Sequence, residues 1–596
     1  MTTGSIQHSL DAAARLHHAG RLAEAEAAYR AILASQPGHP HALHLLGTLA
    51  YQTGHLEPAA DLFLRASATH PEPADCHGNR GVALAGLGRL NEAIAAYRQA
   101  LTLRPQFPEA LNNLGSALQQ SGCPDQAIDC YQQALAIRPD YPEAQNNLGN
   151  ALRDQAQFDA AIAAYRQALQ LRPNYAEAWN NLGSALAETD CTDEAIAACS
   201  RALELRPAFP EALNNLANAL KKQGRLEEAI TACRKAISLQ PALADAWTNL
   251  GNALQRLGRI EESIAAYRRA IALRPDFAIA HVCLGLILLL KGDFSEGWRE
   301  FEWRWRTAEF RTRRRNFTQP LWDGSKLHGK RILLHAEGGL GDAIQFVRYL
   351  PAVADCGGQI LLEATPQLRR LFATLPHIQR FIPAGEELPD FDVHCPLMSL
   401  PLAFNTELST VPAPIPYLLP DRRLADQWRS RMPADHDLLK VGLVWAGRAY
   451  PDPGRSIPPE LLAPLGQVSG VWMCSLQRYE SPEVRPPALP DMKLIDWTAD
   501  LEDLADTAAL IWGLDLVITV DTVVAHLAGA MGKRVWVLLQ FAPDWRWLLD
   551  RPDCPWYPKM RLFRQPKPGD WQSAVRDVAR ELESLAASFP LEPKTP

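Results

Sequence analysis

Two short polar motifs, far apart in the chain, carry side chains suited to chemistry. The first is the glycine-rich turn from Glu337 to Asp342, in which Gly339 and Gly341 precede a helix expected over Ala343 to Val353. The positive end of a helix favours an ionised carboxylate, and a carboxylate that faces a cleft can accept a proton from an attacking hydroxyl. The alternative, that Asp342 only caps its helix, is the more frequent role for this local spacing and stays open.

The second motif follows the apolar run from Leu514 to Val520. It places Asp521 and Thr522 at a strand end and His526 one turn into the next helix, which we expect to end near Gly532. In parallel sheets, ligands bind outside the carboxyl ends of strands, where helix N-termini offer free N–H groups. These three residues are therefore predicted to face an anionic ligand such as a nucleotide phosphate.

A third candidate is the run from Asp544 to Trp547, which follows another expected strand. Arg546 is suited to pair with a donor phosphate or a sugar carboxylate, and Trp545 and Trp547 are suited to stack on a base or a sugar ring. A structural loop anchored by its aromatic residues explains the same pattern equally well.

Strands alternating with helical spacers must position these motifs. From Lys330 the sequence predicts short strands separated by helices, a pattern typical of parallel βαβ sheets. A proline-rich stretch, Val411 to Pro416, separates two such series. Two Rossmann-like lobes with a cleft between facing strand ends are therefore expected. The predicted strands are 331–335, 359–364, segments near Arg380 and Val393, 441–446, 471–477, 494–497, 514–520 and 535–540.

The N-terminal half repeats every 34 residues. Three residue types keep this step in one register. The prolines are Pro37, Pro71, Pro105, Pro139, Pro173, Pro207, Pro241 and Pro275; the glycines are Gly47, Gly81, Gly115, Gly149, Gly183, Gly251 and Gly285, with Ala217 in the missing place; the aromatic or thiol residues are Tyr29, Phe63, Tyr97, Tyr131, Tyr165, Cys199, Cys233 and Tyr267. The pattern resembles the tetratricopeptide repeat over residues 6 to 311, with about nine repeats.

Each repeat is predicted to be a helical hairpin that stacks on its neighbours into a superhelix with a concave groove. The glycine lets the paired helix approach closely, and the aromatic residue is expected to fill the gap to the next repeat. A second glycine series marks the turns between helices. Ala156 and Asp190 interrupt that series, so less ideal turns are expected there.

Two residues before the glycine, an asparagine recurs through the array. A ladder of amides facing the groove is able to bind an extended peptide backbone through both donor and acceptor atoms. The repeat arm of eukaryotic protein O-GlcNAc transferases, which the spacing resembles, has such a ladder. The alternative is that asparagine is simply common at this position of the repeat. The ladder consists of Asn79, Asn113, Asn147, Asn181, Asn215 and Asn249.

The junction after the repeats is rich in tryptophan and arginine. Trp298, Trp303 and Trp305 accompany a basic cluster, and such interleaving is compatible with a nucleic-acid surface. A cap that closes the last repeat and meets the next domain is the favoured interpretation, because large amphipathic side chains suit that role. The basic residues are Arg304, Arg306, Arg311, Arg313, Arg314 and Arg315.

Composition narrows the class of protein. The chain has 596 residues and a formal net charge of −7, which argues against nucleic-acid binding by the whole chain. The eleven scattered cysteines form no CxxC pair and fit reduced thiols better than disulfides or a zinc site. The start of the chain lacks signal-peptide features, and the longest central apolar run, Val282 to Leu290, is about half the length that spans a bilayer. We expect a cytoplasmic protein without a membrane span.

Together, GGLGDAIQFVRYLP and VDTVVAHLAGAMGK resemble the two signatures of bacterial lipopolysaccharide heptosyltransferases, which have a GT-B fold. The resemblance implies that Asp342 is the catalytic base and that Asp521 and Thr522 contact donor phosphates. It also implies a phosphate-binding basic residue, Arg448 or preferably Arg455, and an inverting, metal-independent reaction without a cofactor. Val523 departs from the glycine that the family has there.

The whole architecture is similar to bacterial chains that join tetratricopeptide repeats to such a domain, some of which are soluble flagellin glycosyltransferases. The resemblance is carried by GDFSEGWREFEWRW, AEGGLGDAIQFVRYLP, GLVWAG, SLQ, the Asp–Thr motif, DWRW and WYPKMRLFRQ, in order from Gly292 to Gln565. It implies transfer of a sugar from a nucleotide-sugar to a protein hydroxyl, with flagellin as one such acceptor. Gln345 and Arg348 are expected on the acceptor side, and Gly339, Gly341, His526 and Arg546 on the donor side.

The expected organisation has four segments: the repeat array at 6–311, a junction at 312–329, an N-terminal lobe at 330–420 and a nucleotide-sugar-binding lobe at 421–590. Two alternatives remain. One is a repeat scaffold fused to a catalytically silent transferase-like domain, and the other is a transferase that acts on a lipid or polysaccharide.

Overall fold

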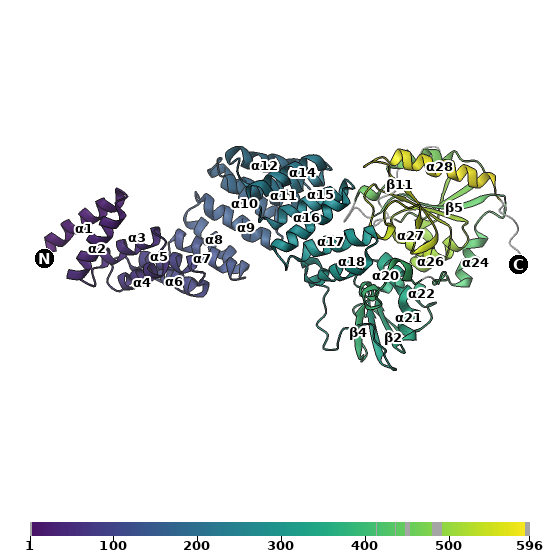
Figure 1. The fold of residues 1–596 in the computed structure, drawn as a ribbon, viewed down its shortest axis with the longest axis horizontal. Coiled ribbons are helices and arrows are strands. Elements are labelled where there is room, and N and C mark those ends of the chain that lie inside the picture. The colour runs from purple at the N-terminus through teal and green to yellow at the C-terminus, as the bar shows by residue number, and fades with distance from the viewer. Residues whose placement is uncertain (1–2, 413, 436, 448–452, 479–491, 590–596) are drawn as a thin grey trace. The chain divides into compact units, whose positions relative to one another are not determined.

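The computed structural model describes residues 3–412, 414–435, 437–447, 453–478 and 492–589 (Figure 1). The chain divides into two compact units, Met1–Ala246 and Trp247–Pro596. The predicted Arg448 lies outside the described residues.

The first unit is a series of helical hairpins, coloured purple to teal in Figure 1. Successive helices contact one another along the whole series, which confirms the predicted solenoid. The helices are α1(Thr3–His18), α2(Leu22–Ser35), α3(Pro40–Gln52), α4(Leu56–Ser67), α5(Pro73–Gly86), α6(Leu90–Leu103), α7(Pro108–Gln120), α8(Pro124–Ile137), α9(Pro142–Asp154), α10(Phe158–Leu171), α11(Ala176–Glu188), α12(Thr192–Leu205), α13(Pro210–Lys222), α14(Leu226–Leu239) and the start of α15(Ala244–Arg256).

The odd-numbered helices of this unit form one side of the array. Each contacts the next odd-numbered helix, from α1 with α3 through to α11 with α13. Helices that touch across alternate positions lie on the inner side of a curved stack, where neighbouring repeats are closest. This side carries the predicted asparagine ladder.

The repeated glycine and the repeated aromatic residue pack against each other within one hairpin. A Cβ atom added to Gly81 would lie 2.5 Å from a ring carbon of Tyr97, and one added to Gly149 would lie 2.5 Å from Tyr165. The aromatic ring therefore fills the space that the glycine of its own hairpin leaves. This corrects the expectation that the ring mainly fills the gap to the next repeat.

The two interrupted turns keep the left-handed backbone of the others. Ala156 and Asp190 both have a φ of 58°, whereas Gly88 and Gly122 have φ of 74° and 79°. Left-handed backbone costs a residue with a Cβ roughly 1–2 kcal/mol. The less ideal turns that the sequence predicts at Ala156 and Asp190 therefore keep the same shape as the others but carry backbone strain.

The second unit begins with helices that continue the repeat pattern and then enters an α/β region. Its first part comprises most of α15, then α16(Ile260–Leu273), α17(Ala278–Lys291), α18(Phe294–Phe301), the 3₁₀ turn η1(Glu302–Arg306) and α19(Ala308–Arg311). A four-stranded parallel sheet follows, in the order β3-β2-β1-β4. Its strands are β1(Arg331–His335), β2(Gln359–Ala364), β3(Ile378–Pro383) and β4(Val393–Pro396).

The helices that accompany this first sheet are short. They are α20(Leu340–Phe346), η2(Val347–Tyr349), α21(Leu350–Asp355), η3(Pro366–Leu368), α22(Arg369–Phe372), η4(Leu397–Ser399), α23(Leu400–Ala403) and η5(Leu408–Thr410).

A larger sheet of seven strands completes the second unit, in the order β10-β11-β9-β8-β5-β6-β7. All its pairs are parallel except β10 with β11. The strands are β5(Leu439–Val444), β6(Val471–Ser475), β7(Leu494–Asp496), β8(Leu516–Val520), β9(Val535–Leu539), β10(Asp553–Cys554) and β11(Tyr557–Arg564). The predicted parallel sheets are confirmed, and β10 and β11 are strands that the sequence interpretation missed.

The helices that accompany the second sheet complete the fold. They are α24(Arg422–Ser430), η6(Pro453–Arg455), η7(Pro459–Leu462), α25(Ala463–Gly466), η8(Thr498–Asp500), α26(Leu504–Trp512), α27(Val523–Ala530), η9(Trp545–Trp547) and α28(Trp571–Ala587).

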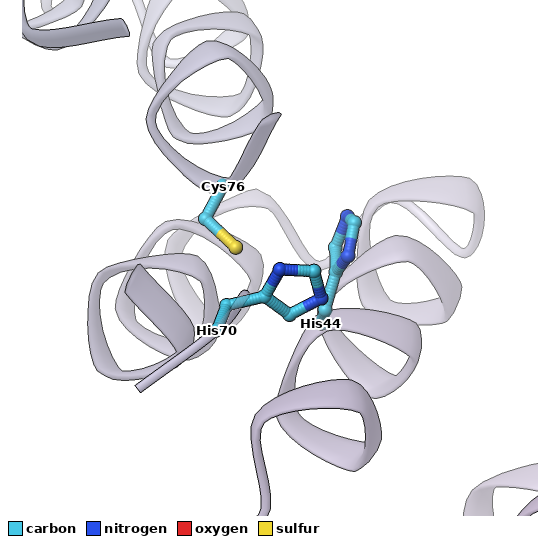
Figure 2. A group of neighbouring side chains, drawn as sticks. All are labelled: His44, His70 and Cys76. Carbon is cyan, nitrogen blue, oxygen red and sulfur yellow. The ribbon is translucent and has the colours of Figure 1, made fainter. Parts of the chain in front are cut away.

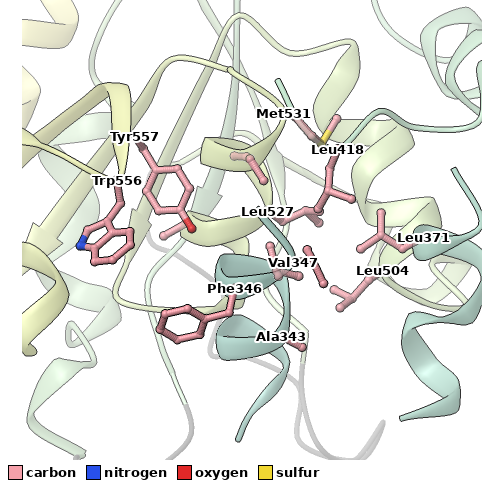
Figure 3. Close-up of a cluster of buried hydrophobic side chains, with 14 of the residues drawn as sticks. Ala343, Phe346, Val347, Leu371, Leu418, Leu504, Leu527, Met531, Trp556 and Tyr557 are labelled. Atoms are coloured by element: carbon pink, nitrogen blue, oxygen red, sulfur yellow. The ribbon is translucent and has the colours of Figure 1, made fainter. Parts of the chain in front are cut away.

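An apolar cluster fills much of the space between the two sheets. It joins Phe346 and Val347, near the first sheet, to Leu527 on α27, to Met531 at the end of that helix and to Trp556 beside β11 (Figure 3). The sequence predicted a cleft between facing strand ends, but here α20 packs directly against α27. Any ligand must therefore bind at the edge of this packed contact.

No helix among the described residues is both long and apolar enough to cross a bilayer.

Candidate functional site

Asp342 lies in the first turn of α20, at the mouth of the glycine-rich turn. The backbone N–H of Gly339, the N-cap residue of α20, donates to Asp342 Oδ2 over 2.6 Å. Gly338 has no room for a Cβ atom, which would collide with the Asp342 carboxylate and with Met398. The glycines thus let the turn wrap around the carboxylate, and the predicted capping role of Asp342 is present in the structure.

Arg546 lies in η9, after β9 of the seven-stranded sheet, and its guanidinium bonds this carboxylate. Its Nη2 donates to Asp342 Oδ1, its Nε donates to Gln345 Oε1 over 2.6 Å, and its Nη1 donates to Asp544 Oδ1 over 2.9 Å. Burial opposes the charge of Arg546, but the carboxylates of Asp544 and Asp342 outweigh this and raise its pKa above the usual value. The side chain of Asp342 keeps 22% exposure, so the pair lies at the edge of the packed contact.

Asp521 and Thr522 lie between the end of β8 and the start of α27, as predicted. Burial, together with the nearby Asp544 carboxylate, raises the pKa of Asp521 to about 6. The positive charges of Arg546 and Arg455 act in the opposite direction on the same group. Thr522 occupies the N-cap position of α27, and its hydroxyl lies 3.0 Å from that of Thr519.

Arg455, the preferred phosphate-binding candidate, is half-buried at the end of η6. Its guanidinium lies against Gly447, where an added Cβ atom would lie 2.5 Å from Arg455 Nε. Because β5 and β8 are neighbouring parallel strands, the segments that follow their carboxyl ends, which carry Arg455 and Asp521, leave the sheet at the same edge.

His526 is enclosed. Its Nδ1 lies 3.0 Å from the Tyr557 hydroxyl, and its ring stacks on Trp547 with centroids 5.4 Å apart. Burial and the charge of Arg546 hold its pKa well below the usual value, so the ring is neutral. A Cβ atom on Gly341 would lie 2.9 Å from the His526 ring. Gly341 therefore allows α20 to approach α27, which is a different role from the predicted contact with the donor.

The predicted acceptor-side residues are interior. Gln345 is fully buried and accepts from Arg546. Arg348 is 2% exposed and donates to the Trp556 carbonyl over 2.7 Å, with its guanidinium near the rings of Tyr417 and Tyr557. These two side chains brace the contact between the lobes, so in this conformation they do not line a surface that an acceptor reaches.

The tryptophans of the Asp544 to Trp547 run are also interior. Trp545 is 4% exposed and meets Trp298 edge to face, while Trp547 is completely buried. Neither ring is available to stack on a base or sugar. The structure favours the alternative stated for this run, a loop anchored by its aromatic residues, with Arg546 directed at Asp342.

The sequence interpretation missed a buried ion pair behind the glycine-rich turn. Arg304 is 1% exposed and donates to Glu337 Oε1 over 3.1 Å and to Ser399 Oγ over 2.7 Å. Burial raises the pKa of Glu337 to about 7, although Arg304 acts to lower it. The available signal was Glu337 itself, a carboxylate directly after an apolar strand and before two glycines.

The junction residues are largely committed to internal contacts. Trp298 is buried, and Trp303 stacks on His281 with ring centroids 3.8 Å apart. Arg313 donates to the Glu337 carbonyl over 2.9 Å, and Arg315 pairs with Glu363 over 2.6 Å. These contacts favour a cap between the repeats and the α/β region over a nucleic-acid surface.

The predicted asparagine ladder is half-buried and bonded from repeat to repeat. Asn147 donates to Asn112 over 3.0 Å, and the same bond joins Asn181 to Asn146 and Asn215 to Asn180. Asn79 instead lies 2.9 Å from the ring of His44. Asn113 lies on α7, and Asn249 on α15, both half-buried. These bonds use one N–H of each donor amide and leave its carbonyl oxygen with acceptor capacity.

A hollow of about 640 Å³ also opens in the array, at α10, α11 and α12. Its lining includes Leu169, Trp179 and Leu182, together with the ion pair of Arg166 and Glu194 at 2.6 Å. It is remote in sequence from the Asp342 site and belongs to the repeat surface.

Comparison with known proteins identifies the repeats. Tetratricopeptide-repeat family models match residues 16–78 and, in overlapping segments, 81–277. The N-terminal half is a tetratricopeptide-repeat array. Such repeats imply protein–protein interaction.

The chain is also similar to Protein FlbA of Caulobacter vibrioides. The two are 28% identical over 326 residues, which cover 51% of this chain and 54% of FlbA. The chain thus spans about half the length of this curated relative.

Solved structures with similar helical hairpins include MamA, which is 28% identical over 27% of this chain and 94% of its own, with a TM-score of 0.26. YrrB, described as a TPR protein with an unusual peptide-binding site, is 22% identical over 31% of this chain and 95% of its own, also with a TM-score of 0.26. At these TM-scores the likeness carries no argument about function.

Proposed function

We propose that the protein is a glycosyltransferase that moves a sugar from a nucleotide-sugar to a hydroxyl of a protein held by the repeat array. One observation carries the proposal: Asp342 from one α/β lobe meets Arg546 from the other, beside Asp521 and Thr522. Two lobes of parallel strands with a site at their meeting edge are consistent with the GT-B fold that the sequence resemblance implies.

In the proposed reaction, the acceptor hydroxyl attacks the anomeric carbon of the donor sugar. Its proton passes to the Asp342 carboxylate, and the bond from the anomeric carbon to the phosphate oxygen breaks. The negative charge left on the phosphate is stabilised by Arg546 and Arg455, and by the N-terminal N–H groups of α27 next to Thr522. No metal or cofactor is required by this scheme.

The ion pair between Asp342 and Arg546 would keep the base inactive before the donor binds. Asp342 Oδ1 is bonded to Arg546 and Oδ2 to the Gly339 N–H, so neither oxygen is ready to take a proton. A donor phosphate competes for Arg546, because a guanidinium binds phosphate and carboxylate in the same way. Donor binding would then free Asp342 Oδ1 next to the reacting sugar. Asp342 would therefore act as a base only when the donor is bound.

The acceptor is proposed to be a polypeptide, and flagellin is the one that the sequence resemblance implies. The repeated amides on the odd-numbered helices support this, since their carbonyl oxygens can accept from the N–H groups of an extended chain. A cytoplasmic location is part of the same proposal.

A silent scaffold is the second candidate. Both oxygens of Asp342 are engaged, and apolar side chains fill the contact behind them. A transferase-like domain that has lost turnover would keep this closed arrangement and leave the repeats as the functional part.

A binding screen separates the two candidates. Thermal unfolding of the full chain is measured with ADP-, UDP-, GDP- and CMP-linked sugars, because a ligand at a hundred times its Kd adds about 2.7 kcal/mol of stability. Stabilisation by one nucleotide class supports the enzyme. No response to any of them leaves the scaffold.

For a donor that binds, Asp342→Asn is expected to lower kcat by about 10²- to 10⁴-fold, the range for loss of a general base. Donor affinity should stay the same or rise, because the amide keeps the shape of the carboxylate but competes less strongly with the donor phosphate for Arg546. Asp355→Asn, an exposed carboxylate at the end of α21, is the matched control and should keep full activity. Full turnover by Asp342→Asn would refute its assignment as the base.

A further inference from the structure

We propose a zinc-binding site in the first unit, formed by His44, His70 and Cys76 (Figure 2). His44 lies on α3, His70 follows α4, and Cys76 lies on α5. One sulfur and two imidazole nitrogens are a ligand set that suits zinc better than magnesium or calcium. The three residues belong to consecutive elements of two successive hairpins, so a bound ion would tie those hairpins together.

The repeat register shows that this group is a departure from the pattern of the array. At 34-residue steps from His44, the chain has Gly78 and then four asparagines, of which Asn112, Asn146 and Asn180 accept the ladder bonds. At the steps from His70 it has Arg104, Arg138, Arg172 and Arg206, and at the steps from Cys76 it has only alanine, from Ala42 to Ala280. At one place in the array, His44, His70 and Cys76 thus occupy positions where later repeats mostly have asparagine, arginine and alanine, respectively.

Histidine is also concentrated near this place. Nine of the 16 histidines fall within the first 77 residues: His8, His17, His18, His39, His41, His44, His55, His70 and His77. In the structure the ring of His41 lies 4.7 Å from that of His70, centroid to centroid. Among the residues that the structure describes, His44 and His70 are the histidines that combine with a thiol at ligand distance.

The geometry is close to that of a zinc site. The three ligand atoms lie within 4.8 Å of one another, so a common point lies no more than about 2.8 Å from each, compared with zinc bond lengths of about 2.0–2.3 Å. Small rotations of the side chains close this difference. His44 and His70 are half-buried, which leaves a path for the ion and a fourth position for water.

The surroundings of the rings support ligation. His70 Nε2 is buried and makes no hydrogen bond among the described residues, while its Nδ1 accepts from the Glu72 N–H over 3.0 Å. His44 Nε2 lies 2.9 Å from the amide nitrogen of Asn79. When Nδ1 binds the ion, this amide must turn so that its oxygen accepts from Nε2–H, and such a contact orients a ligand ring through its second nitrogen. When the zinc–sulfur bond forms, the Cys76 thiol gives its proton to solvent, and when the ring of His70 binds, it gives up its bond from Glu72.

This site would fix the first rung of the asparagine ladder, because Asn79 contacts one of its ligands. Zinc would therefore stiffen the array between α3 and α5. The inference depends on the repeat array alone and holds whether or not the α/β region transfers sugar.

The test uses the full chain without a histidine tag and Co²⁺ as the spectroscopic probe. The wild type is expected to bind one Co²⁺ with a thiolate-to-cobalt charge-transfer band, which Zn²⁺ removes and Mg²⁺ does not. Cys76→Ser should abolish the band and weaken Zn²⁺ binding roughly 100-fold or more, since the thiolate is the strongest ligand of the set. Cys123→Ser, a half-buried cysteine of the same region, is the matched control and should keep both properties.

A second variant protects the test against misfolding. His70→Arg restores the residue that five later repeats carry at this position, so it should keep the helical circular dichroism while losing the band. Cobalt bound without a thiolate band, or a band that survives Cys76→Ser, would overturn the proposal. The first result would mean that histidines bind the metal without Cys76, and the second that another cysteine supplies the thiolate.

Discussion

The two units differ in the burial of their ion pairs: those of the repeat array are largely exposed, whereas the second unit contains buried pairs beside its exposed ones. In four hairpins of the repeat array, an arginine directly after the second helix bonds a carboxylate on the first helix of the same hairpin, as Arg138 does with Glu109 and Arg172 with Glu143. These side chains are about 40% exposed. In the second unit, Arg304 and Glu337 pair with side-chain exposures of 1% and 2%, and Arg304 also bonds the half-buried Glu302.

The difference separates two sources of stability. Exposed pairs contribute about 0–1 kcal/mol each, so the array depends on the repeated packing of rings on glycines. Buried pairs contribute little as pairs, but breaking one leaves an uncompensated charge. The second unit is therefore the one in which a single polar substitution should be severe.

The largest expected effect is that of Arg304→Met. It leaves Glu337 buried beside the Met398 N–H without its cation, which should lower the local free energy of unfolding by about 3–5 kcal/mol. Segment-resolved hydrogen exchange on the full chain measures this in residues 330–400. The loss should be smaller at pH 5.5 than at pH 8, because a protonated Glu337 no longer needs the cation.

The matching change in the array is Arg138→Met. It removes an arginine with the same kind of partner but an exposed one, so less than about 1 kcal/mol should be lost in residues 107–174. Equal losses from the two substitutions would contradict the contrast between the units.

A second, smaller effect comes from His335 at the end of β1. Burial, together with the neighbouring His394, lowers the pKa of His335 to about 3. Because protonation then favours the unfolded chain, the stabilisation is present above about pH 6.5 and is lost as the pH falls toward 3. Between pH 7 and pH 5 the loss should be about 2 kcal/mol.

Urea unfolding of the full chain, followed by proteolysis of the second unit, measures this pH dependence. His335→Gln should remove most of it, whereas His328→Asn, at an exposed position, should leave it unchanged. An unaltered pH dependence in His335→Gln would show that other groups are responsible.

The smallest expected effect belongs to the array. Ala156→Gly relieves a left-handed turn with a φ of 58°, and after the entropy cost of glycine a gain of about 0.5–1 kcal/mol remains. Hydrogen exchange in α9 and α10 measures the gain. Asp190→Gly should gain less, because aspartate tolerates this backbone better than alanine. Destabilisation by Ala156→Gly would mean that the turn is not strained.

Much of the fold could be predicted because its signals are local or periodic. The 34-residue step determines the hairpins, and apolar runs gave strands such as β1 and β2 with correct bounds. The strand β11 was missed because Tyr557 to Arg564 mixes prolyl, basic and apolar residues, and its pairing with β9 is a tertiary contact.

The candidate site was predicted as two motifs but not as a geometry. Asp342 and Asp521 follow from strand ends and helix starts, which are visible in sequence. The burial of Arg348 and Trp547 was not visible, because it results from the packing of α20 against α27. The sequence alone does not distinguish an arginine that faces a ligand from one that is buried between helices, because the difference lies in the residues that surround it.

By itself, the sequence determined the repeat array, the parallel α/β region and the positions of the two polar motifs, since each depends on residues close together or evenly spaced. Only the tertiary structure decided which side chains meet. It joined Arg546 to Asp342, 204 residues away, enclosed Glu337 with Arg304, and gathered His44, His70 and Cys76 into one cluster although no cysteine motif marks them. The physical reason is that pairing, burial and ligation depend on distances in space. Separation along the chain determines such distances only between residues of one regular repeat.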